Sequence, residues 1–314
     1  MSNARNLANL LGTGTQITTA DIADGAFQAN RNLIINGAMQ VAQRGTSFSA
    51  TGTIYTVDRW EVFTGNSNCT TTQEEFTVGQ TDVPHNPTHY INVAKNGETQ
   101  ACQVRQKIED VRILSGETVT LSFWANTSST LALDIFQNFG TGGSTQQQRL
   151  SGGSFTIVET NGSWSKYQIT NTQSNVSGKT IGAGSYTLFR IVETTATTND
   201  VAVTQVQLEV GDTATPFEHR SYGDELARCQ RYYQKLWFRS YNIFTDYTGN
   251  QYATQSLVNP IRADATVTNS GSTGANITIT LIKTVYDTAL EVQCASSGSH
   301  NNWVTADIYV DAEL

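Results

Sequence analysis

The stretch VAVTQVQLEVGDTATPFEHRSYGDELARCQRYYQKL, residues 201–236, organises the rest of the chain. In residues 201–210, β-branched and apolar side chains alternate with polar ones, which predicts a strand with one apolar and one polar face. The polar face would carry Gln205, Gln207 and Glu209. Gly211 ends this strand, and Pro216 carries the chain out in an extended conformation because its ring leaves no backbone N–H for a sheet. The stretch therefore predicts a strand that leaves its sheet at a proline.

A short helix is predicted after this exit. Asp224 can cap it or complete a capping box with Ser221, and four apolar side chains follow at helical spacing. A helix of about three turns is marginal on its own in water, so it must pack on another part of the protein. We expect residues 223–236 to form a helical neck between two β domains, with its apolar side chains along one seam. The seam consists of Leu226, Cys229, Tyr233 and Leu236.

Five motifs resemble those of a known class of virion proteins. They are NLIINGAMQVAQRGTSF (32–48), VDRW (57–60), TPFEHRSYGDEL (215–226), ARCQRYYQKL (227–236) and ADIYVDAEL (306–314). With these motifs the chain resembles bacteriophage tail-fibre and virion-fibre proteins, whose lectin-like sandwich looks like the jelly roll of carbohydrate-binding modules. The resemblance spans nearly the whole chain and implies a virion protein with trimeric fibre tips, but it identifies no ligand. On this view the apolar seam of the neck faces the three-fold axis of the trimer.

Composition narrows the class of protein further. A length of 314 residues suggests about two domains. Only 15% of the residues are charged, so Thr, Ser, Asn, Gln and Gly must form much of the surface, and these residues favour strands and turns. The formal charge of −8 argues against a nucleic-acid partner, because no basic stripe could neutralise phosphates.

The sequence also bears on where the protein is made. No apolar run reaches the roughly 20 residues that a membrane span needs. The N-terminal residues lack the apolar core of a secretory signal. We therefore expect a protein that is made in the host cytoplasm and does not insert into a membrane. The resemblance to phage fibres implies that it then becomes part of the virion.

The four cysteines, at positions 69, 102, 229 and 294, are too few and too scattered for a disulfide scaffold. A bridge between Cys69 and Cys102 is one alternative, and buried free thiols are the favoured one. No C-x-x-C motif occurs, which excludes a zinc ribbon.

The chain divides into an arm, a sandwich, the neck and a distal domain, which makes the predicted fold class mainly β. Residues 1–31 are interpreted either as an arm that attaches the protein to other virion proteins or as a disordered tail. Residues 32–222 predict a lectin-like jelly-roll sandwich of about nine strands. Residues 237–314 predict a small distal β domain, whose core trimerisation would complete. The apolar residues of the arm are Leu7, Leu10 and Leu11.

Motifs for catalysis are absent from the sequence. No G-x-S-x-G elbow, P-loop or dinucleotide fingerprint occurs. A helical metal pair at His85 and His89 is disfavoured because two prolines interrupt the segment. Adjacent carboxylates would point to opposite faces of a strand, which disfavours a glycosidase pair. We therefore expect no enzyme activity.

Aromatic side chains mark the candidate binding sites, because sugar rings stack on flat aromatic faces beside polar groups. The strands predicted at 119–124 and 131–136 are separated by a Thr/Ser turn and are expected to pair. This pairing would gather four side chains outward as a glycan platform, as a cross-strand packing group or as a surface covered by a neighbouring subunit. The four are Trp124, Asp134, Phe136 and Gln137.

Other aromatic residues have separate interpretations. Trp60 and Trp164 are expected in the core. His300 and Trp303 lie in or beside polar turns of the distal domain, where host contacts of a fibre would belong. The alternative for Trp303 is that it fills the core of a trimeric tip.

No cofactor is expected except a structural calcium ion, which jelly-roll modules of this kind often hold. No calcium-loop motif occurs, so Asp58 and Glu209 are candidate ligands by position alone.

Together these features favour a trimeric bacteriophage fibre or virion-surface protein that adheres to host glycans through many weak contacts. One alternative is a purely structural capsid-fibre or tail-connecting protein without receptor binding. Another is a polysaccharide-active enzyme that carries an accessory module.

Overall fold

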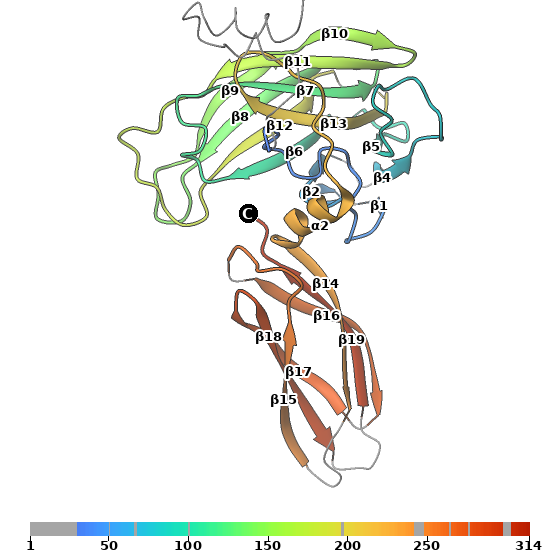
Figure 1. Ribbon diagram of the computed structural model, residues 1–314, viewed down its shortest axis with the longest axis vertical. Coiled ribbons are helices and arrows are strands. Elements are labelled where there is room, and N and C mark those ends of the chain that lie inside the picture. The colour runs from blue at the N-terminus through green and yellow to red at the C-terminus, as the bar shows by residue number, and fades with distance from the viewer. Residues whose placement is uncertain are drawn as a thin grey trace, which may run out of the picture.

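The computed structural model describes residues 30–314 except 50, 66–67, 100, 196–197, 242–247, 264, 276 and 298–302. Of the residues singled out from the sequence, those outside this described part are Leu7, Leu10, Leu11 and His300. The described part is mainly β, as predicted: a large and a small sandwich are joined by helix α2 (Figure 1).

The large sandwich consists of two antiparallel sheets, in keeping with a jelly roll. The seven-stranded sheet has the order β1-β4-β5-β13-β7-β11-β10, with β1 Ser47–Phe48, β4 Thr70–Glu75, β5 His89–Ala94, β7 Thr118–Asn126, β10 Thr156–Asn161, β11 Trp164–Thr172 and β13 Val201–Val210. The six-stranded sheet has the order β2-β3-β6-β12-β8-β9, with β2 Gly52–Tyr55, β3 Glu61–Thr64, β6 Cys102–Glu109, β8 Leu131–Asn138, β9 Gln147–Ser154 and β12 Tyr186–Glu193.

The core of the large sandwich lies between these sheets because alternate residues of each strand point to the same face. Leu121 and Phe123 of β7 are buried in one cluster with Ile135 of β8 and Phe189 of β12. The Phe123 ring stacks on Tyr167 with 5.3 Å between centroids. Full burial of such side chains contributes about 1.5–3 kcal/mol each, so this cluster holds the two sheets together.

Strand β13 runs between β5 and β7 in the seven-stranded sheet, but its polar face is not exposed to solvent. Gln205, Gln207 and Glu209 are at most 3% exposed. A bulge with Gln205 in the left-handed region (φ 50°) shifts the register between Thr204 and Gln207. The Gln205 amide donates to the Pro84 carbonyl at 2.8 Å. Buried polar groups need partners, and the linker after the strand supplies the others.

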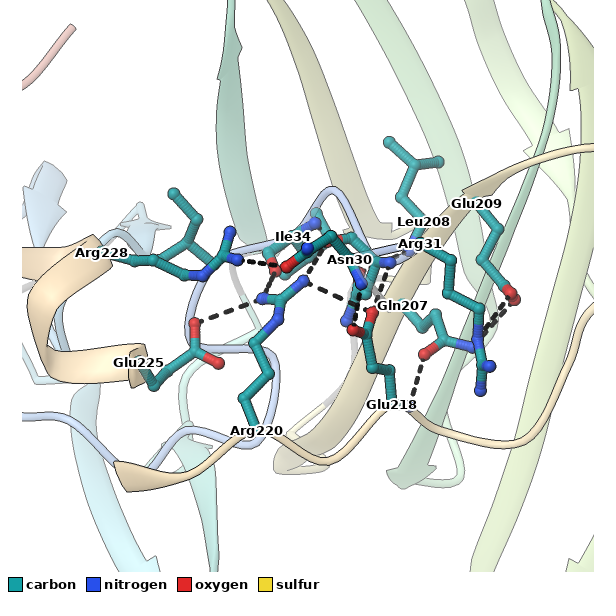
Figure 2. A network of polar contacts seen from close by, with 12 residues as sticks. Asn30, Arg31, Ile34, Gln207, Leu208, Glu209, Glu218, Arg220, Glu225 and Arg228 are labelled. Atoms are coloured by element: carbon teal, nitrogen blue, oxygen red, sulfur yellow. Dashed lines mark hydrogen bonds and ion pairs between the residues drawn. The ribbon is translucent and has the colours of Figure 1, made fainter. Parts of the chain in front are cut away.

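The linker 211–221 returns over this polar face and fixes the first described residues. The Glu218 carboxylate accepts hydrogen bonds from the backbone N–H groups of Asn30 (2.6 Å) and Asn32 (2.7 Å). The Glu218 N–H in turn donates to Gln207 Oε1 at 2.7 Å (Figure 2). One glutamate thus joins β13 to the segment that contains Asn30, which lies 188 positions before Glu218.

Arg220 extends this network to helix α2 (Figure 2). Its guanidinium donates to the carbonyl oxygens of Asn32 and Ile34. It also lies 3.5 Å from the carboxylate of Glu225 on the helix. Glu225 is 4% exposed and accepts a hydrogen bond from the Asn36 N–H at 2.6 Å. A carboxylate so buried needs these partners, and they fix segment 30–36 between the linker and the helix.

Helix α2 (Tyr222–Gln230) begins as predicted and ends early. Ser221 is the N-cap: its Oγ accepts the Asp224 N–H at 3.1 Å and lies 2.7 Å from Asp224 Oδ2, so the two predicted residues do cap the helix together. Two residues after the helix the chain enters β14 (Tyr233–Tyr241), which pairs with β19 (Trp303–Asp311). The predicted helix over 223–236 is therefore wrong in its second half, because pairing with a strand distant in sequence overrides the local apolar spacing.

The prediction that the four seam residues form an exposed face on a three-fold axis is wrong. Cys229, Tyr233 and Leu236 are 0%, 6% and 7% exposed within a single chain. The last two belong to a strand, and of the four seam residues Leu226 alone keeps partial exposure. The chain's own packing covers these side chains, so they cannot line an axis between subunits. Trimerisation itself stays a prediction.

The small sandwich is built from two three-stranded sheets. Their orders are β14-β19-β16 and β15-β18-β17, with β15 Thr248–Ser256, β16 Thr266–Ala275, β17 Ile277–Tyr286 and β18 Ala289–Ser297. The side chains between them that are 0% exposed are Leu290, Val292, Val304, Ile308 and Val310. This core is buried within one chain, whereas the sequence suggested that trimerisation would complete it.

Buried charges fasten the two sandwiches to each other. Arg59 is 2% exposed and pairs with Glu313 of the last described residues. Its guanidinium also donates to the Lys107 carbonyl at 2.8 Å and lies 3.5 Å from the centroid of the Tyr232 ring. We name as the junction the region where segment 30–44, Arg59, linker 211–221, α2 and residues 311–314 meet.

The last residues of the chain extend the junction beneath the large sandwich (Figure 1). Arg44 pairs with Asp311 at 3.1 Å and with Glu313 at 3.2 Å. The Leu314 carbonyl accepts from Tyr55 Oη at 3.2 Å and from Lys107. The small sandwich is therefore anchored at both its first and its last strand.

The four cysteines are buried and free, as favoured, so Cys69 and Cys102 form no bridge. Burial raises the pKa of the Cys102 thiol to about 12, which keeps it protonated at neutral pH.

Candidate functional site

A groove of about 710 Å³ lies on the outer face of the seven-stranded sheet. It is floored by residues of β5, β7 and β13 that alternate with core residues: Tyr90 and Asn92 line it, whereas Ile91 between them is in the core. The loops after β4, β7 and β12 complete its walls. The full set of polar lining side chains is Glu75, Thr77, Gln80, Asp82, Asn92, Asn126, Thr127, Ser128, Thr198, Asn199 and Asp200. We name this feature the groove.

Three aromatic rings form one wall of the groove. Phe76 lies 4.8 Å from Tyr90 and 5.3 Å from Trp164, and Tyr90 lies 5.4 Å from Trp164, measured between ring centroids. The tilted and edge-on angles of these pairs are those that aromatic quadrupoles favour. Trp164, at 4% exposure, holds the trio in place by packing on the buried Val83 and Trp124.

The wall formed by loop 77–83 is tied to the turn between β10 and β11. Gln80 closes the loop on itself, since its amide donates to the Val83 carbonyl (2.8 Å) and accepts from the Val83 N–H (2.9 Å). Asn161 Nδ2 donates to the Thr81 carbonyl. Gly162, with φ 57°, lies so close that a Cβ would come within 3.0 Å of Asp82 Oδ1. This turn therefore holds Asp82 at the edge of the groove.

The opposite wall depends on a buried ion pair. Lys95 Nζ and Glu193 Oε2 are 2.6 Å apart and both side chains are fully buried. Glu193 also accepts a hydrogen bond from Ser129 Oγ at 2.8 Å, next to the groove residues 127–128. The Lys95 N–H donates to Asp200 Oδ1 at 2.8 Å. The pair thus places the 127–129 turn through Glu193, whereas Asp200 is held by the backbone N–H of Lys95.

The groove combines aromatic rings with hydrogen-bonding groups, which are the two elements of sugar recognition. The Tyr90 hydroxyl is protonated at neutral pH and can donate; burial, with a smaller effect of the nearby Glu74, raises its pKa further. No cluster of three or more His, Cys, Asp or Glu side chains suited to a metal occurs within the described residues. Nor does any helix in that part of the chain have the length and hydropathy to cross a membrane.

The predicted outward cluster on 119–124 and 131–136 is wrong, because β7 and β8 belong to different sheets. Trp124 is 3% exposed and supports the wall of the groove instead of forming a platform. Asp134 and Phe136 lie on the other side of the sandwich, where Arg190 pairs with Asp134 at 2.8 Å and covers the Phe136 ring at 4.1 Å. Gln137 is fully buried and accepts a hydrogen bond from Arg149 at 2.7 Å.

The remaining tryptophans lie in the core, in the groove wall and at the distal end. Trp60 is in the core, as expected, and donates its indole N–H to the Asn36 carbonyl at 2.9 Å. Trp164 is buried as expected but also lines the groove. Trp303 is 37% exposed at the start of β19, on the same sheet face as Trp237, which is 60% exposed.

The residues suggested for calcium do not fit a calcium site. Asp58 accepts hydrogen bonds from the backbone and side-chain nitrogens of Gln43. Glu209 accepts from Gln207 and Thr215 and lies 3.3 Å from the Arg31 guanidinium. Calcium requires six to eight oxygen ligands, whereas N–H donors and a cation occupy these carboxylates.

The groove residues escaped sequence reasoning because they are far apart in the chain. Phe76, Tyr90 and Trp164 come from the loop after β4, from β5 and from β11. Tyr90 does stand between core residues in an alternating strand, which marks it as outward-facing. Nothing local indicates that a second and a third ring would join it.

Comparison with known proteins adds a likeness of fold alone. No protein-family model matches the chain. No curated protein matches it either. Among solved structures, the chain is similar to the enzymatically active domain of tailspike protein 4 of bacteriophage CBA120, with a TM-score of 0.34 and 12% identity over 58% of this chain and 22% of that one.

Two further structures are similar at the same level. The CBM22-1 xylan-binding domain of Xyn10C from Paenibacillus barcinonensis has a TM-score of 0.33 and 13% identity over 60% of this chain and all of that one (100%). The apo form of a cyclase from Fischerella sp. has a TM-score of 0.36 and 12% identity over 57% and 95%. A xylan-binding domain and a cyclase therefore share the fold to the same degree. At these TM-scores neither structure indicates what this chain binds.

Proposed function

We propose that the protein is a bacteriophage fibre or virion-surface protein whose jelly roll binds glycans of the host surface through the groove. The observation that carries the proposal is the wall of Phe76, Tyr90 and Trp164 opposite exposed carboxylate and hydroxyl groups in one open groove. Aromatic faces accept the C–H faces of a sugar ring, while the polar wall accepts and donates hydrogen bonds to its hydroxyls. A groove of this size takes a short stretch of glycan.

The virion role is supported by the five motifs that resemble phage fibre proteins. On this reading residues 1–31 attach the protein to other virion proteins and three copies form the fibre. Individual glycan contacts would be weak, and several copies on one particle would convert them into firm adhesion.

The binding test compares a groove variant with a matched variant elsewhere. The protein is screened on a glycan array, and affinity for the tightest oligosaccharide is measured by calorimetry for the wild type, Tyr90→Ala and Tyr286→Ala. Tyr90→Ala should weaken binding about tenfold or more, equal to about 1.4 kcal/mol, because it removes a stacking face. Tyr286, which is 70% exposed on the small sandwich, should be neutral when replaced. Equal effects of the two changes would contradict binding in the groove.

A purely structural role is the second candidate, and one observation favours it. The motifs that carry the fibre resemblance lie at the junction and not in the groove: for example, Arg59, Glu218 and Glu313 all belong to them. Silence on the array, together with incorporation of the protein into particles, would favour this role.

The trimer is tested separately by native mass spectrometry. A mass about three times the 34.2 kDa of one chain would support it. A monomer would remove the trimer while leaving the binding test unaffected.

A further inference from the structure

The charged side chains that line the groove are acidic. Three carboxylates line it, those of Glu75, Asp82 and Asp200, and all three residues are exposed. Among the described residues that line the groove, none is a Lys or an Arg. The ammonium of Lys95 supports the wall from inside the sandwich, where its pairing with Glu193 already neutralises it.

The other charged groups near these carboxylates do not reverse that sign. His89 lies 3.7 Å from Glu75 and faces one of the three acids only. Asp82 is set against Gly162, which carries no charge, and Asp200 accepts a backbone N–H. The nearby lining side chains Asn92, Asn126 and Gln80 are uncharged amides.

From this charge pattern we infer that the groove selects uncharged or amino-sugar glycans and rejects glycans that carry carboxylate, sulfate or phosphate groups. The inference rests on the proposed glycan binding and names the ligand class of the same site. Carboxylate oxygens accept hydrogen bonds from sugar hydroxyls. An acidic sugar would instead bring like charges within a few ångströms of each other, where low-dielectric walls strengthen the repulsion. An ammonium group would be attracted by the same field.

The test uses two forms of one sugar chain. The probes are the neutral oligosaccharide that binds most tightly on the array and the same oligosaccharide after oxidation of its primary alcohols to carboxylates. Affinities are measured by calorimetry in about 20 mM salt, where screening is weak. The wild type should bind the oxidised form about tenfold more weakly. The double variant Glu75→Gln/Asp82→Asn should reduce that difference to about threefold or less.

A matched control separates the groove from the overall charge of −8. The double variant Glu117→Gln/Glu159→Gln removes two exposed carboxylates outside the groove, so it changes the net charge by the same amount and should keep the tenfold difference. The inference is overturned if the oxidised form binds as tightly as the neutral one, or if both double variants change the difference equally. Absence of binding to any glycan would instead remove the proposed function, and the inference with it.

Discussion

The junction and the groove are built from the same kinds of residues and put them to opposite uses. At the junction, acids and bases meet one another: Arg59 reaches Glu313, and Glu218 accepts two backbone N–H groups. In the groove, Glu75 and Asp82 are exposed beside an aromatic wall. A polar group whose hydrogen bonds are satisfied within the chain cannot recognise a ligand, whereas an exposed one can.

This difference fits the position of the five motifs, which lie at the junction and not in the groove. The junction requires particular residues at fixed places, since a buried charge without its partner costs several kcal/mol. The groove requires only a suitable mixture of aromatic and polar side chains on a given sheet face. Sequence motifs therefore gather at the first region and leave little trace at the second.

The largest expected effect is on stability and would come from removing the buried arginine of the junction. Arg59→Ala leaves Glu313 buried at 4% side-chain exposure without its main cation and removes the guanidinium from the Tyr232 ring. We expect the free energy of unfolding to fall by about 3–5 kcal/mol, measured by urea denaturation. Affinity for the array-selected glycan should stay unchanged in the folded fraction. A drop in affinity equal to that of Tyr90→Ala would erase the distinction between the two regions.

The control for this variant is Arg112→Gln. Arg112 pairs with Asp110 at the surface, and exposed pairs contribute little. Its denaturation midpoint should match that of the wild type.

A smaller effect, on both properties at once, is expected at the buried pair behind the groove. Glu193→Gln leaves the Lys95 ammonium buried without a countercharge. We expect a loss of about 3 kcal/mol in the free energy of unfolding. Because Glu193 also accepts the hydrogen bond from Ser129 that holds the 127–129 turn beside the groove, glycan affinity should fall too. Glu117→Gln, an exposed change, should alter neither. Unchanged affinity in Glu193→Gln would show that the groove wall does not depend on this pair.

The smallest effect is a pH dependence at the junction. Burial raises the pKa of Asp58 above its ordinary 3.8, and the hydrogen bonds from Gln43 only partly oppose this. The folded state then keeps a proton that the unfolded chain has released, so the contribution of Asp58 to stability declines as pH rises from 3.8 through the folded pKa.

Two measurements check this dependence. Carboxyl-carbon NMR should show Asp58 titrating above 3.8. Denaturation from pH 4 to pH 7 should show the stability of the wild type relative to Asp58→Asn falling as the pH rises. A midpoint at or below 3.8, or a constant difference, would contradict it.

Much of the fold could be predicted from alternation in the sequence, and the errors share one physical cause. Alternation correctly indicated the strand at 201–210 and placed Gln207 on its polar face, but it did not show that this face is buried. That face is covered by Glu218 and by a segment from the start of the chain. Period-two spacing shows which residues share a face of a strand, and it does not show what covers that face.

The candidate site was harder to predict for the same reason. The strands that carry Trp124 and Asp134 are close in sequence, which predicted that they pair as a hairpin. In the jelly roll they belong to different sheets. The rings that do meet, Tyr90 and Trp164, lie 74 positions apart in the sequence. Only the completed topology places them together.

The anchoring of the small sandwich has a mechanical consequence. The chain enters it through β14 and leaves it through β19, and these strands are paired at Tyr233 and Asp311, where they meet the large sandwich. The Ala312 N–H donates to the Tyr232 carbonyl at 2.8 Å, which closes the second attachment beside the first. A body fixed at two adjacent points does not swivel about a single linker bond. A force on the far end of the small sandwich is therefore transmitted to the large sandwich as a bending moment, and the two sandwiches rotate together.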